Sequence, residues 1–206
     1  MNSLQEIGLK THTDKAFDHY FCTFYEKNLN KNISKLWEIG ILNGASLQMW
    51  SEYYPNAEIT GFDIEDKHSL KLNNNVSVKL LDQGNKEQLK KLANENKNID
   101  IIVDDGSHII DHQIMTFEIL FNSLKSGGQY IIEDLHTSTN LWNNYNYKNN
   151  KGTLQYLNDI ISNNIPENYP GQIKTHEVIK SIKSINLLSN NFTACGRSIT
   201  AIITKK

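Results

Sequence analysis

The sequence has little cysteine and no long apolar run, and these two absences exclude several classes of protein. Its 206 residues include only two cysteines, Cys22 and Cys195, which are too few for the disulfide framework of a small secreted domain. No apolar stretch approaches the roughly 20 residues of a membrane span. The N-terminal segment also lacks the apolar core of a secretory signal. We therefore expect a cytoplasmic protein with no membrane span.

Charge of neither sign is in excess. The chain has 21 basic and 23 acidic residues, a formal net charge of −2 and a pI near 6.4. This balance gives no electrostatic case for binding nucleic acid or a membrane surface. Apolar residues make up only 38% of the chain, but they recur with ordinary periodicity, so we expect a folded domain.

Short apolar runs alternate with amphipathic segments along most of the chain. We expect strands at Ile33–Ile39, Glu58–Phe62, Val76–Leu80, Ile99–Val103 and Tyr130–Ile132. Helices are expected at Ala45–Tyr54, Asn85–Asn96, Asp111–Leu124 and Thr153–Ile161. A final antiparallel pair of strands is expected at Ile182–Leu188 and Ser198–Thr204. This order predicts an α/β fold, a Rossmann-like doubly wound sheet, in a single domain spanning residues 1–206.

Two segments fall outside this alternation. Residues 1–30 form an N-terminal segment, in which residues 1–13 are expected to be a polar lead-in and Asp14–Asn28 an amphipathic helix. Residues 136–152 form a long polar, Asn-rich stretch, which we interpret as a substrate lid. Its aromatic residues can stack on a sugar ring or a base, although a disordered linker with incidental aromatics would also explain them; they are Trp142, Tyr145 and Tyr147.

Two strands about thirty residues apart end in carboxylates. The run IDIIVDDGSH ends on Asp104, Asp105 and His108, and GGQYIIEDLH ends on Glu133 and Asp134, followed by His136. Ligands bind outside the carboxyl ends of strands in an open parallel sheet, so we expect these side chains to meet there. Hard oxygen ligands favour Mg²⁺ or a similar divalent cation. Asp104 is expected to point the other way from its neighbour and to play a supporting or cofactor-binding role.

The first expected strand leads into a second group of candidate residues. Glu38, Gly40 and Gly44 form a strand–turn–helix that does not match the dinucleotide-binding pattern G-x-G-x-x-G. Asp63 follows the second strand, about twenty residues after the turn, where a carboxylate can accept hydrogen bonds from ribose hydroxyls. The pair at 82–83, Asp-Gln, follows the third strand and would lie near a bound base. Each residue alone is weak evidence, and their joint placement favours a cofactor site.

These segments resemble a known family. An E-x-G-x-x-x-G turn and an acid after the second strand are the layout of class I S-adenosylmethionine-dependent methyltransferases. GASLQMWSEYYPNAEITGFDI, DQ, VDDGSH and IIEDLHTS together resemble the metal-dependent sugar O-methyltransferases of macrolide biosynthesis and related bacterial enzymes linked to polysaccharides. The resemblance covers roughly Thr13–Ser138, with the opening TDKAFDHYFCTFYE, and fades after it.

The resemblance implies a seven-stranded, mostly parallel sheet with a C-terminal antiparallel hairpin. It implies S-adenosylmethionine and a divalent cation, Mg²⁺ or similar, held by Asp105, Glu133 and Asp134. It places His108 as the general base, and a histidine pKa of about 6.5 suits that role. Lys15 matches the opening motif and could neutralise a cofactor carboxylate, although a helix N-cap next to it explains the motif equally well. The predicted cofactor-binding residues are Lys15, Glu38, Gly40, Gly44, Ser46, Asp63, Asp82, Gln83 and Asp104.

The sequence thus predicts an S-adenosylmethionine-dependent, metal-assisted O-methyltransferase acting on a sugar hydroxyl, with no nucleic-acid partner and a possible homo-oligomer. His136, Trp142 and Tyr145 are the candidate substrate contacts. A nucleotide-binding oxidoreductase is disfavoured because G-x-G-x-x-G is missing. The same residues would also suit a methyltransferase for a non-sugar molecule or a non-catalytic binding domain, and the acceptor stays open.

Overall fold

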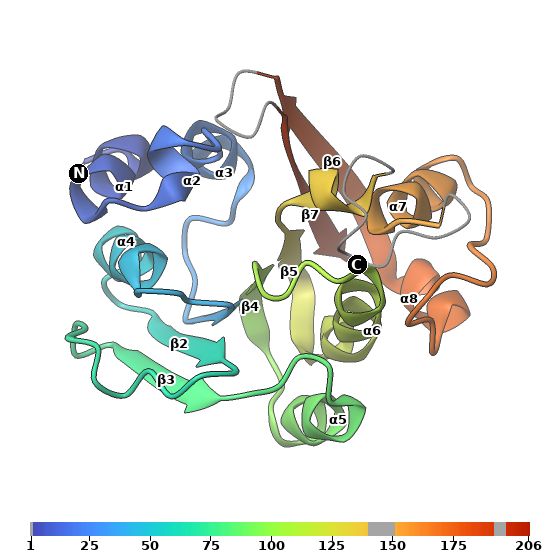
Figure 1. Cartoon of the computed structure of the whole chain (residues 1–206), viewed down its shortest axis with the longest axis horizontal. Coiled ribbons are helices and arrows are strands. Elements are labelled where there is room, and N and C mark those ends of the chain that lie inside the picture. Colours follow the sequence, from blue (N-terminus) through green and yellow to red (C-terminus); the bar gives the residue numbers. More distant parts are fainter. Residues whose placement is uncertain (1, 140–150, 192–196) are drawn as a thin grey trace.

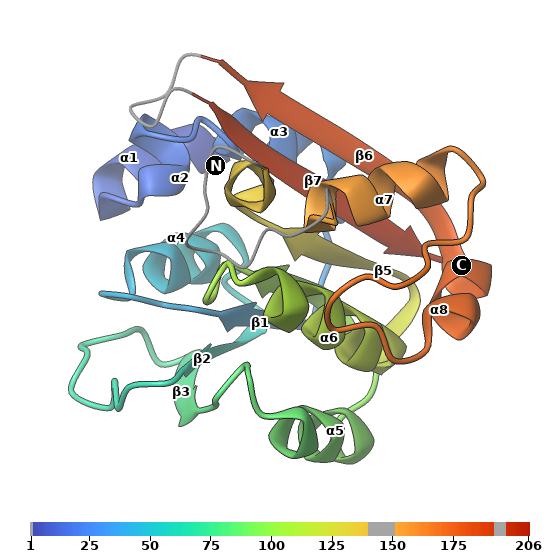
Figure 2. The same cartoon turned by 45° about the vertical axis from the view of Figure 1, so that its right-hand side comes forward.

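The computed structural model describes residues 2–139, 151–191 and 197–206. Its centre is one seven-stranded sheet in the order β3-β2-β1-β4-β5-β7-β6 (Figures 1 and 2). The strands are β1 (Lys35–Ile39), β2 (Glu58–Asp63), β3 (Val76–Leu80), β4 (Ile99–Asp104), β5 (Leu124–Ile132), β6 (Ile182–Asn190) and β7 (Ser198–Lys205). Strands β1 to β5 are parallel, and β7 pairs antiparallel with β5 and β6. The predicted fold class is confirmed.

Helices cover both faces of this sheet (Figure 1). One layer contains α1 (Leu4–Thr11), α2 (Asp14–Phe17), α3 (Cys22–Asn28) and α4 (Ala45–Tyr53). The other contains α5 (Lys86–Glu95), α6 (Ile110–Leu120), α7 (Thr153–Ile161) and α8 (Thr175–Ser181). Two short 3₁₀ turns, η1 (Phe121–Ser123) and η2 (Leu135–Ser138), flank β5. None of the described helices is both long and apolar enough to cross a bilayer.

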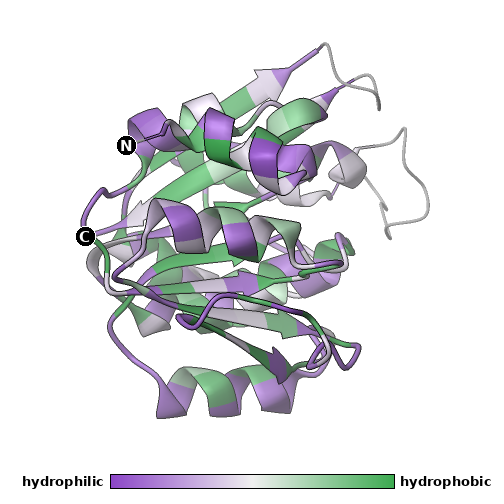
Figure 3. Cartoon of the chain, turned by 90° about the vertical axis from the view of Figure 1, so that its left-hand side faces the viewer, coloured by the Kyte–Doolittle hydropathy of each residue, from purple (hydrophilic) through white to green (hydrophobic). Residues whose placement is uncertain are grey.

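The sheet separates two hydrophobic cores because successive side chains of a strand point to opposite faces. In β4, Ile101 and Val103 pack with Trp50 of the first layer, whereas Ile102 packs with Phe117 of the second. All six residues of β4 are buried, as expected for a central parallel strand covered on both faces. Figure 3 shows hydrophobic stretches along the strands and alternating hydrophobic and hydrophilic stretches along the helices.

The N-terminal segment differs from its prediction. Residues 1–13 are not a lead-in, because they contain α1, whose Leu4 and Ile7 are buried against α4. The signal missed in the sequence is the capping box of Ser3 and Glu6, in which each side chain accepts from the other's backbone N–H. The helix expected at Asp14–Asn28 is broken into α2 and α3, with Tyr20 in the left-handed region at φ 56°.

Two other segments also differ from the prediction. The helix expected to reach Leu124 ends at Leu120, and Leu124 already belongs to β5. Helix α8 was not predicted, because its stability depends on a distant buried carboxylate. Glu118 of α6 accepts hydrogen bonds from the backbone N–H of Ile173 and Lys174 at 2.5 and 2.6 Å, just before α8.

The C-terminal strands hold the N-terminal segment in place. The Tyr25 hydroxyl lies 3.0 Å from Thr200 Oγ1 of β7, and His19 Nδ1 lies 2.7 Å from Ser198 Oγ. Asn190 Nδ2 of β6 donates to the carbonyl of His19 at 2.8 Å. The chain between α2 and α3 therefore rests on residues more than 170 positions away, as the separations of 171 and 179 residues show.

Replacing Leu4 with alanine should lower the free energy of unfolding by about 2–5 kcal/mol, because the side chain is fully buried and leaves a cavity. Leu9→Ala is the matched control in the same helix, since Leu9 is 48% exposed and should change the free energy by less than about 1 kcal/mol. Urea denaturation of both variants measures the difference. Equal losses would show that α1 does not belong to the core.

Candidate functional site

The site lies where the strand order changes direction. From β1 the chain moves to β2 and β3 on one side and then to β4 on the other. The connections that follow β1 and β4 therefore lead toward opposite edges of the sheet. Ligands of open α/β sheets bind in this crevice. Gly40, in the loop after β1, has φ +79°, and a Cβ on it would lie 2.1 Å from the carbonyl oxygen of Asp105. Only glycine allows the two loops to approach this closely.

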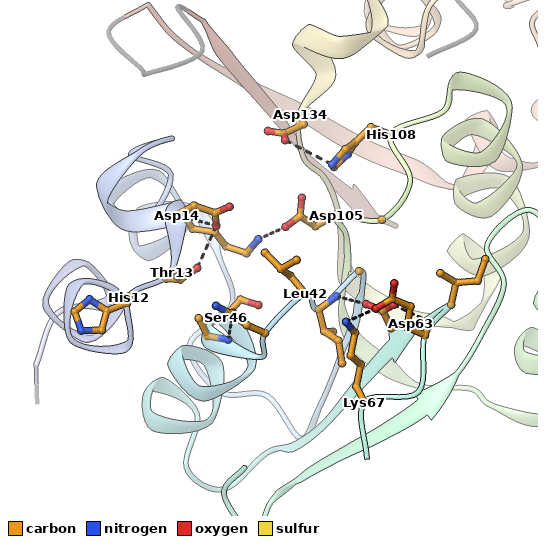
Figure 4. A pocket seen from close by; sticks show the side chains of 18 of the residues that line it. His12, Thr13, Asp14, Leu42, Ser46, Asp63, Lys67, Asp105, His108 and Asp134 are labelled. Atoms are coloured by element: carbon orange, nitrogen blue, oxygen red, sulfur yellow. Dashed lines mark hydrogen bonds and ion pairs between the residues drawn. The ribbon is translucent and has the colours of Figure 1, made fainter. Parts of the chain in front are cut away.

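A cavity of about 460 Å³ opens at this point (Figure 4). Its volume is within the range of small-molecule sites. Asp105, His108 and Asp134 lie at one end, and Asp63 and Lys67 at the other. The lining therefore contains seven of the residues predicted from the sequence: Lys15, Gly40, Ser46, Asp63, Asp105, His108 and Asp134.

Three carboxylates meet the ammonium group of Lys15 beneath the cavity. Lys15 Nζ lies 2.5 Å from Asp105 Oδ2, 3.0 Å from Glu133 Oε2 and 3.4 Å from Glu38 Oε1. The alternation of strand side chains explains the arrangement. Glu38, Asp105 and Glu133 are in phase with Leu36, Val103 and Ile131, which all pack in the core on the α1–α4 side. The carboxylates consequently project toward α2, which carries Lys15.

The cluster contains three carboxyl groups and one ammonium group, and the pKa values of its members are shifted as a result. Burial opposes the charged form of Lys15, but the charges of Asp105, Glu133 and Glu38 raise its pKa well above the ordinary value. Burial raises the pKa of Glu133 well above its usual range despite the charge of Lys15, and it also raises the pKa of Asp105. It raises the pKa of Glu38 to about 7. An additional cation would stabilise the ionised carboxylates.

A group of side chains suited to a divalent cation lies next to this cluster. Ligand atoms of Asp105, His108 and Asp134 are all within 4.8 Å of one another, and among the described residues no other group meets this test. His108 and Asp134 both have left-handed backbones, with φ 56° and 53°, a strained conformation that recurs at functional sites. Asp134 Oδ1 is buried and accepts no hydrogen bond from the described residues. The donor set fits a hard cation.

Glu133, the third predicted metal ligand, is placed differently from the other two. It is 1% exposed, does not line the cavity and contacts Lys15. Its role as a ligand stays a prediction.

Two more histidines surround Asp134. The Nδ1 atoms of His19 and His136 lie 3.6 and 3.8 Å from Asp134 Oδ1, and His108 Nε2 lies 3.7 Å from Asp134 Oδ2. Burial lowers the pKa of His136 and favours its neutral form. His136 is 6% exposed and does not line the cavity, so its role as a substrate contact stays a prediction. His19 was not assigned from the sequence, because its contact with Asp134 bridges 115 positions.

Several predicted cofactor residues lie behind the cavity wall. Glu38 is fully buried and accepts from Ser46 Oγ at 2.9 Å, and Gly44 forms the left-handed N-cap of α4 at φ 80°. Gln83 donates to Asp104 Oδ1 at 2.7 Å and accepts from the backbone N–H of Ser107 at 2.9 Å, so it braces the loop after β4.

Asp104 points away from Asp105, as expected. It packs on the α6 side with Tyr130, and burial raises its pKa to about 7. Asp82 accepts from the backbone N–H of Gly84 at 2.8 Å and does not line the cavity. Direct cofactor contacts by Asp82, Gln83 and Asp104 stay predictions.

The cavity also contains residues that sequence reasoning missed. Phe17 is 51% exposed, although its place in an amphipathic pattern predicts a core or interface residue, and Leu42 and Ile64 are 75% and 68% exposed at the far end. Large exposed apolar residues next to Asp63 offer surface for a flat ring. Leu42 and Ile64 lie in the loops after β1 and β2, and this position could have identified them as cavity residues from the sequence. Trp142, Tyr145 and Tyr147 lie outside the described residues.

Known proteins resemble this chain in sequence. It is 34% identical over 154 residues to L-olivosyl-oleandolide 3-O-methyltransferase of Streptomyces antibioticus and 36% identical over 138 residues to a tetracenomycin-C rhamnosyl 2'-O-methyltransferase of Streptomyces olivaceus. It is 33% identical over 149 residues to mycinamicin VI 2''-O-methyltransferase of Micromonospora griseorubida. These alignments cover 69%, 64% and 66% of this chain but only 39%, 35% and 36% of the relatives. No protein-family model matches the chain.

Solved structures agree with the sequence matches. The methyltransferase MycE, in complex with Mg, SAH and mycinamycin VI, superposes with a TM-score of 0.78 at 27% identity, covering 99% of this chain and 53% of that one. The homologues of this chain are class I S-adenosylmethionine-dependent sugar O-methyltransferases. The predicted resemblance is confirmed. An O-methyltransferase from Bacillus cereus, at 14% identity and a TM-score of 0.56, shares the fold alone with this methyltransferase homologue.

In this methyltransferase homologue, Gly40→Ala should lower the free energy of unfolding by at least about 2 kcal/mol more than Gly127→Ala. Both glycines have positive φ, but a Cβ at Gly127 meets nothing within 4 Å, so that variant measures backbone strain alone, about 1–2 kcal/mol. Guanidinium denaturation of both variants checks the difference. Equal effects would show that the contact between the two loops does not constrain the structure.

Proposed function

We propose that this chain is an S-adenosylmethionine-dependent, divalent-metal-assisted O-methyltransferase that acts on a sugar hydroxyl. One observation supports this most strongly: Asp105, His108 and Asp134 share one end of a cavity whose other end contains Asp63. Candidate metal ligands at one end of a cavity and a candidate ribose-binding acid at the other suit a transfer reaction. In such a reaction a nucleoside cofactor donates a group to an acceptor that chelates the metal. The chain spans less than two fifths of its sequence relatives, so the activity is a proposal.

The cofactor would lie along the loop after β1. Asp63 already accepts from the backbone N–H of Ile41 at 3.1 Å and of Glu65 at 2.9 Å, which fixes its carboxylate at the cavity. A carboxylate has further lone pairs for two ribose hydroxyls. The Gly40 turn, which lies against the backbone of Asp105, would be beside the methionine moiety. The SAH bound in the MycE structure supports this choice of cofactor.

The metal would be Mg²⁺ or a similar ion, as in the MycE complex. Asp105 and Asp134 would hold it, with Glu133 as the third carboxylate predicted from the sequence. When bound, such an ion stabilises a developing alkoxide and orients the acceptor hydroxyls. Oxygen-rich ligands and the lack of a cysteine at the described site favour Mg²⁺ over zinc.

His108 would remove the proton of the acceptor hydroxyl. Its side chain lines the cavity and is 20% exposed, and Asp134 at 3.7 Å can orient the ring. S-adenosylmethionine, when bound, would supply the methyl group from its sulfonium and leave as the neutral thioether, and His108 would accept the proton of the hydroxyl. The sulfonium activates the methyl group, so in-line positioning supplies much of the remaining catalysis.

The acceptor would be a sugar hydroxyl. The names of the relatives support a sugar hydroxyl of a natural product. A hexose or heptose, nucleotide-activated or part of a surface polysaccharide, stays a prediction. A substrate lid over residues 136–152, a homo-oligomer and a cytoplasmic location stay predictions. Methyl transfer from S-adenosylmethionine to a panel of activated sugars, followed by mass spectrometry with and without Mg²⁺, tests the function. NADH binding in place of S-adenosylmethionine would favour an oxidoreductase instead.

Asp105→Asn should abolish Mg²⁺-dependent methyl transfer and weaken Mg²⁺ binding, while SAH still binds, because the change removes a ligand charge and leaves the Asp63 end intact. Calorimetric titrations of SAH and of Mg²⁺ measure the two effects separately. Asp63→Ala is the opposite control, expected to weaken SAH and spare Mg²⁺. Loss of SAH binding with unchanged Mg²⁺ binding in Asp105→Asn would overturn the assignment.

His108→Ala should lower kcat about 10²- to 10⁴-fold, the usual contribution of a general base, with little change in the Kd for Mg²⁺. Kinetics and Mg²⁺ calorimetry on the same preparation check this. A parallel loss of Mg²⁺ affinity would identify His108 as a metal ligand, an outcome that its place in the Asp105 group allows for.

A further inference from the structure

Lys15 is the only buried lysine among the residues that the structure describes, and it is 1% exposed. An ammonium has three N–H donors. Nζ donates hydrogen bonds to Asp105 Oδ2 and Glu133 Oε2 at 2.5 and 3.0 Å, and Glu38 Oε1 forms an ion pair with it at 3.4 Å. Three protein carboxylates thus already balance the charge of Lys15, and the contact with a cofactor carboxylate that the opening sequence motif suggested stays a prediction.

The contacts of Lys15 overlap with the candidate metal group. Asp105 belongs to both, because its Oδ2 atom contacts Lys15 while the side chain also lies within 4.8 Å of His108 and Asp134. Glu133 contacts Lys15 and is outside that group. The Lys15 ammonium group thus lies between Glu133 and Asp105. A single cation at this place contacts both carboxylates.

We propose that Lys15 competes with the divalent cation for the same carboxylates. In the metal-free protein the Lys15 ammonium group pairs with Glu133 and Asp105, and it must release Glu133 when the metal binds. Like charges a few ångströms apart repel strongly inside a protein. Lys15 therefore weakens metal binding and also removes the repulsion among three carboxylates that would otherwise destabilise the empty site. The inference rests on the metal site of the proposed function.

The competitor also links the metal to the N-terminal segment. Lys15 is in the four-residue helix α2, whose first residue, Asp14, accepts from the Lys15 backbone N–H at 2.9 Å. Helix α2 is also held by its fully buried Ala16, which packs in the same core as α1 and α3. Release of Glu133 changes the surroundings of the ammonium group, which gives a signal that does not depend on turnover.

Lys15→Met should bind Mg²⁺ at least about tenfold more tightly than the wild type, since the repelling charge is gone. Isothermal titration with Mg²⁺ alone, without cofactor or acceptor, measures the Kd. The control is Lys10→Met, which makes the same charge change at a side chain that is 65% exposed and forms an ion pair with Glu52 of α4 at 2.9 Å. Lys10→Met should leave the Kd unchanged. An unchanged or weaker affinity of Lys15→Met would overturn the inference.

The variant Lys15→Met/Glu133→Gln tests whether the gain arises from Glu133. If Lys15 competes for this carboxylate, the second change removes most of the gain. A gain that survives Glu133→Gln would contradict the proposed competition. If neither the wild type nor Lys15→Met binds Mg²⁺, the proposed metal site fails as well; if both bind it equally, only the role of Lys15 fails.

The wild type supplies an independent measurement, which is needed because Lys15→Met leaves the buried Glu38 and Glu133 and the partly exposed Asp105 without a cation and so destabilises the Mg²⁺-free variant. The ¹⁵N signal of the buried Lys15 ammonium group should shift when Mg²⁺ is added, whereas the signals of exposed lysines such as Lys10 should not. A Lys15 signal that stays unchanged at saturating Mg²⁺ would overturn the inference.

Discussion

The ion cluster around Lys15 is the interaction on which the rest of the site depends. Three parallel strands end close together, and each sends a carboxylate to the same face of the sheet. Buried charges are tolerated only when they are paired, and the ammonium of Lys15 supplies that pairing. It can do so only because α1 and α3 pack in the core and hold α2 over the sheet. The N-terminal segment is therefore part of the site, and the positions of Asp105 and Glu133 depend on it.

Local patterns were sufficient to predict most of the sheet. β3 and α7 have the predicted bounds, and β1, β2 and β4 differ by one or two residues at one end, because a run of β-branched residues followed by an acid marks a strand and its carboxyl end. β5 was predicted only in part, since it begins at Leu124 and not at Tyr130. The strand phase also predicted that Asp104 and Asp105 point to opposite faces. The rule that parallel strands end at one edge of a sheet predicted that Asp105, His108 and Asp134 would meet, although the predicted metal ligands included Glu133 and not His108.

What the sequence did not reveal are the contacts between distant segments. The motif containing Lys15 was visible, but its three partners lie at the ends of β1, β4 and β5, and no periodicity in the N-terminal segment identifies them. The same limit applies to Glu118, which stabilises the start of α8 from another helix. Helix α1 was missed for a different reason: it has only a few apolar positions, and its capping signal is short.

The contacts that join the two ends of the chain also constrain how the protein folds. His19 and Tyr25 rest on Ser198 and Thr200, so the turn between α2 and α3 cannot take its final form until β7 has paired with β5. Closing such long loops lowers the conformational entropy of the chain before the new contacts stabilise it. The parallel part of the sheet can form during synthesis, but the segment that follows Lys15 gains its contacts with β7 only when the last strand is in place. A ribosome-bound chain without β7 would therefore carry every site motif and still lack an ordered site.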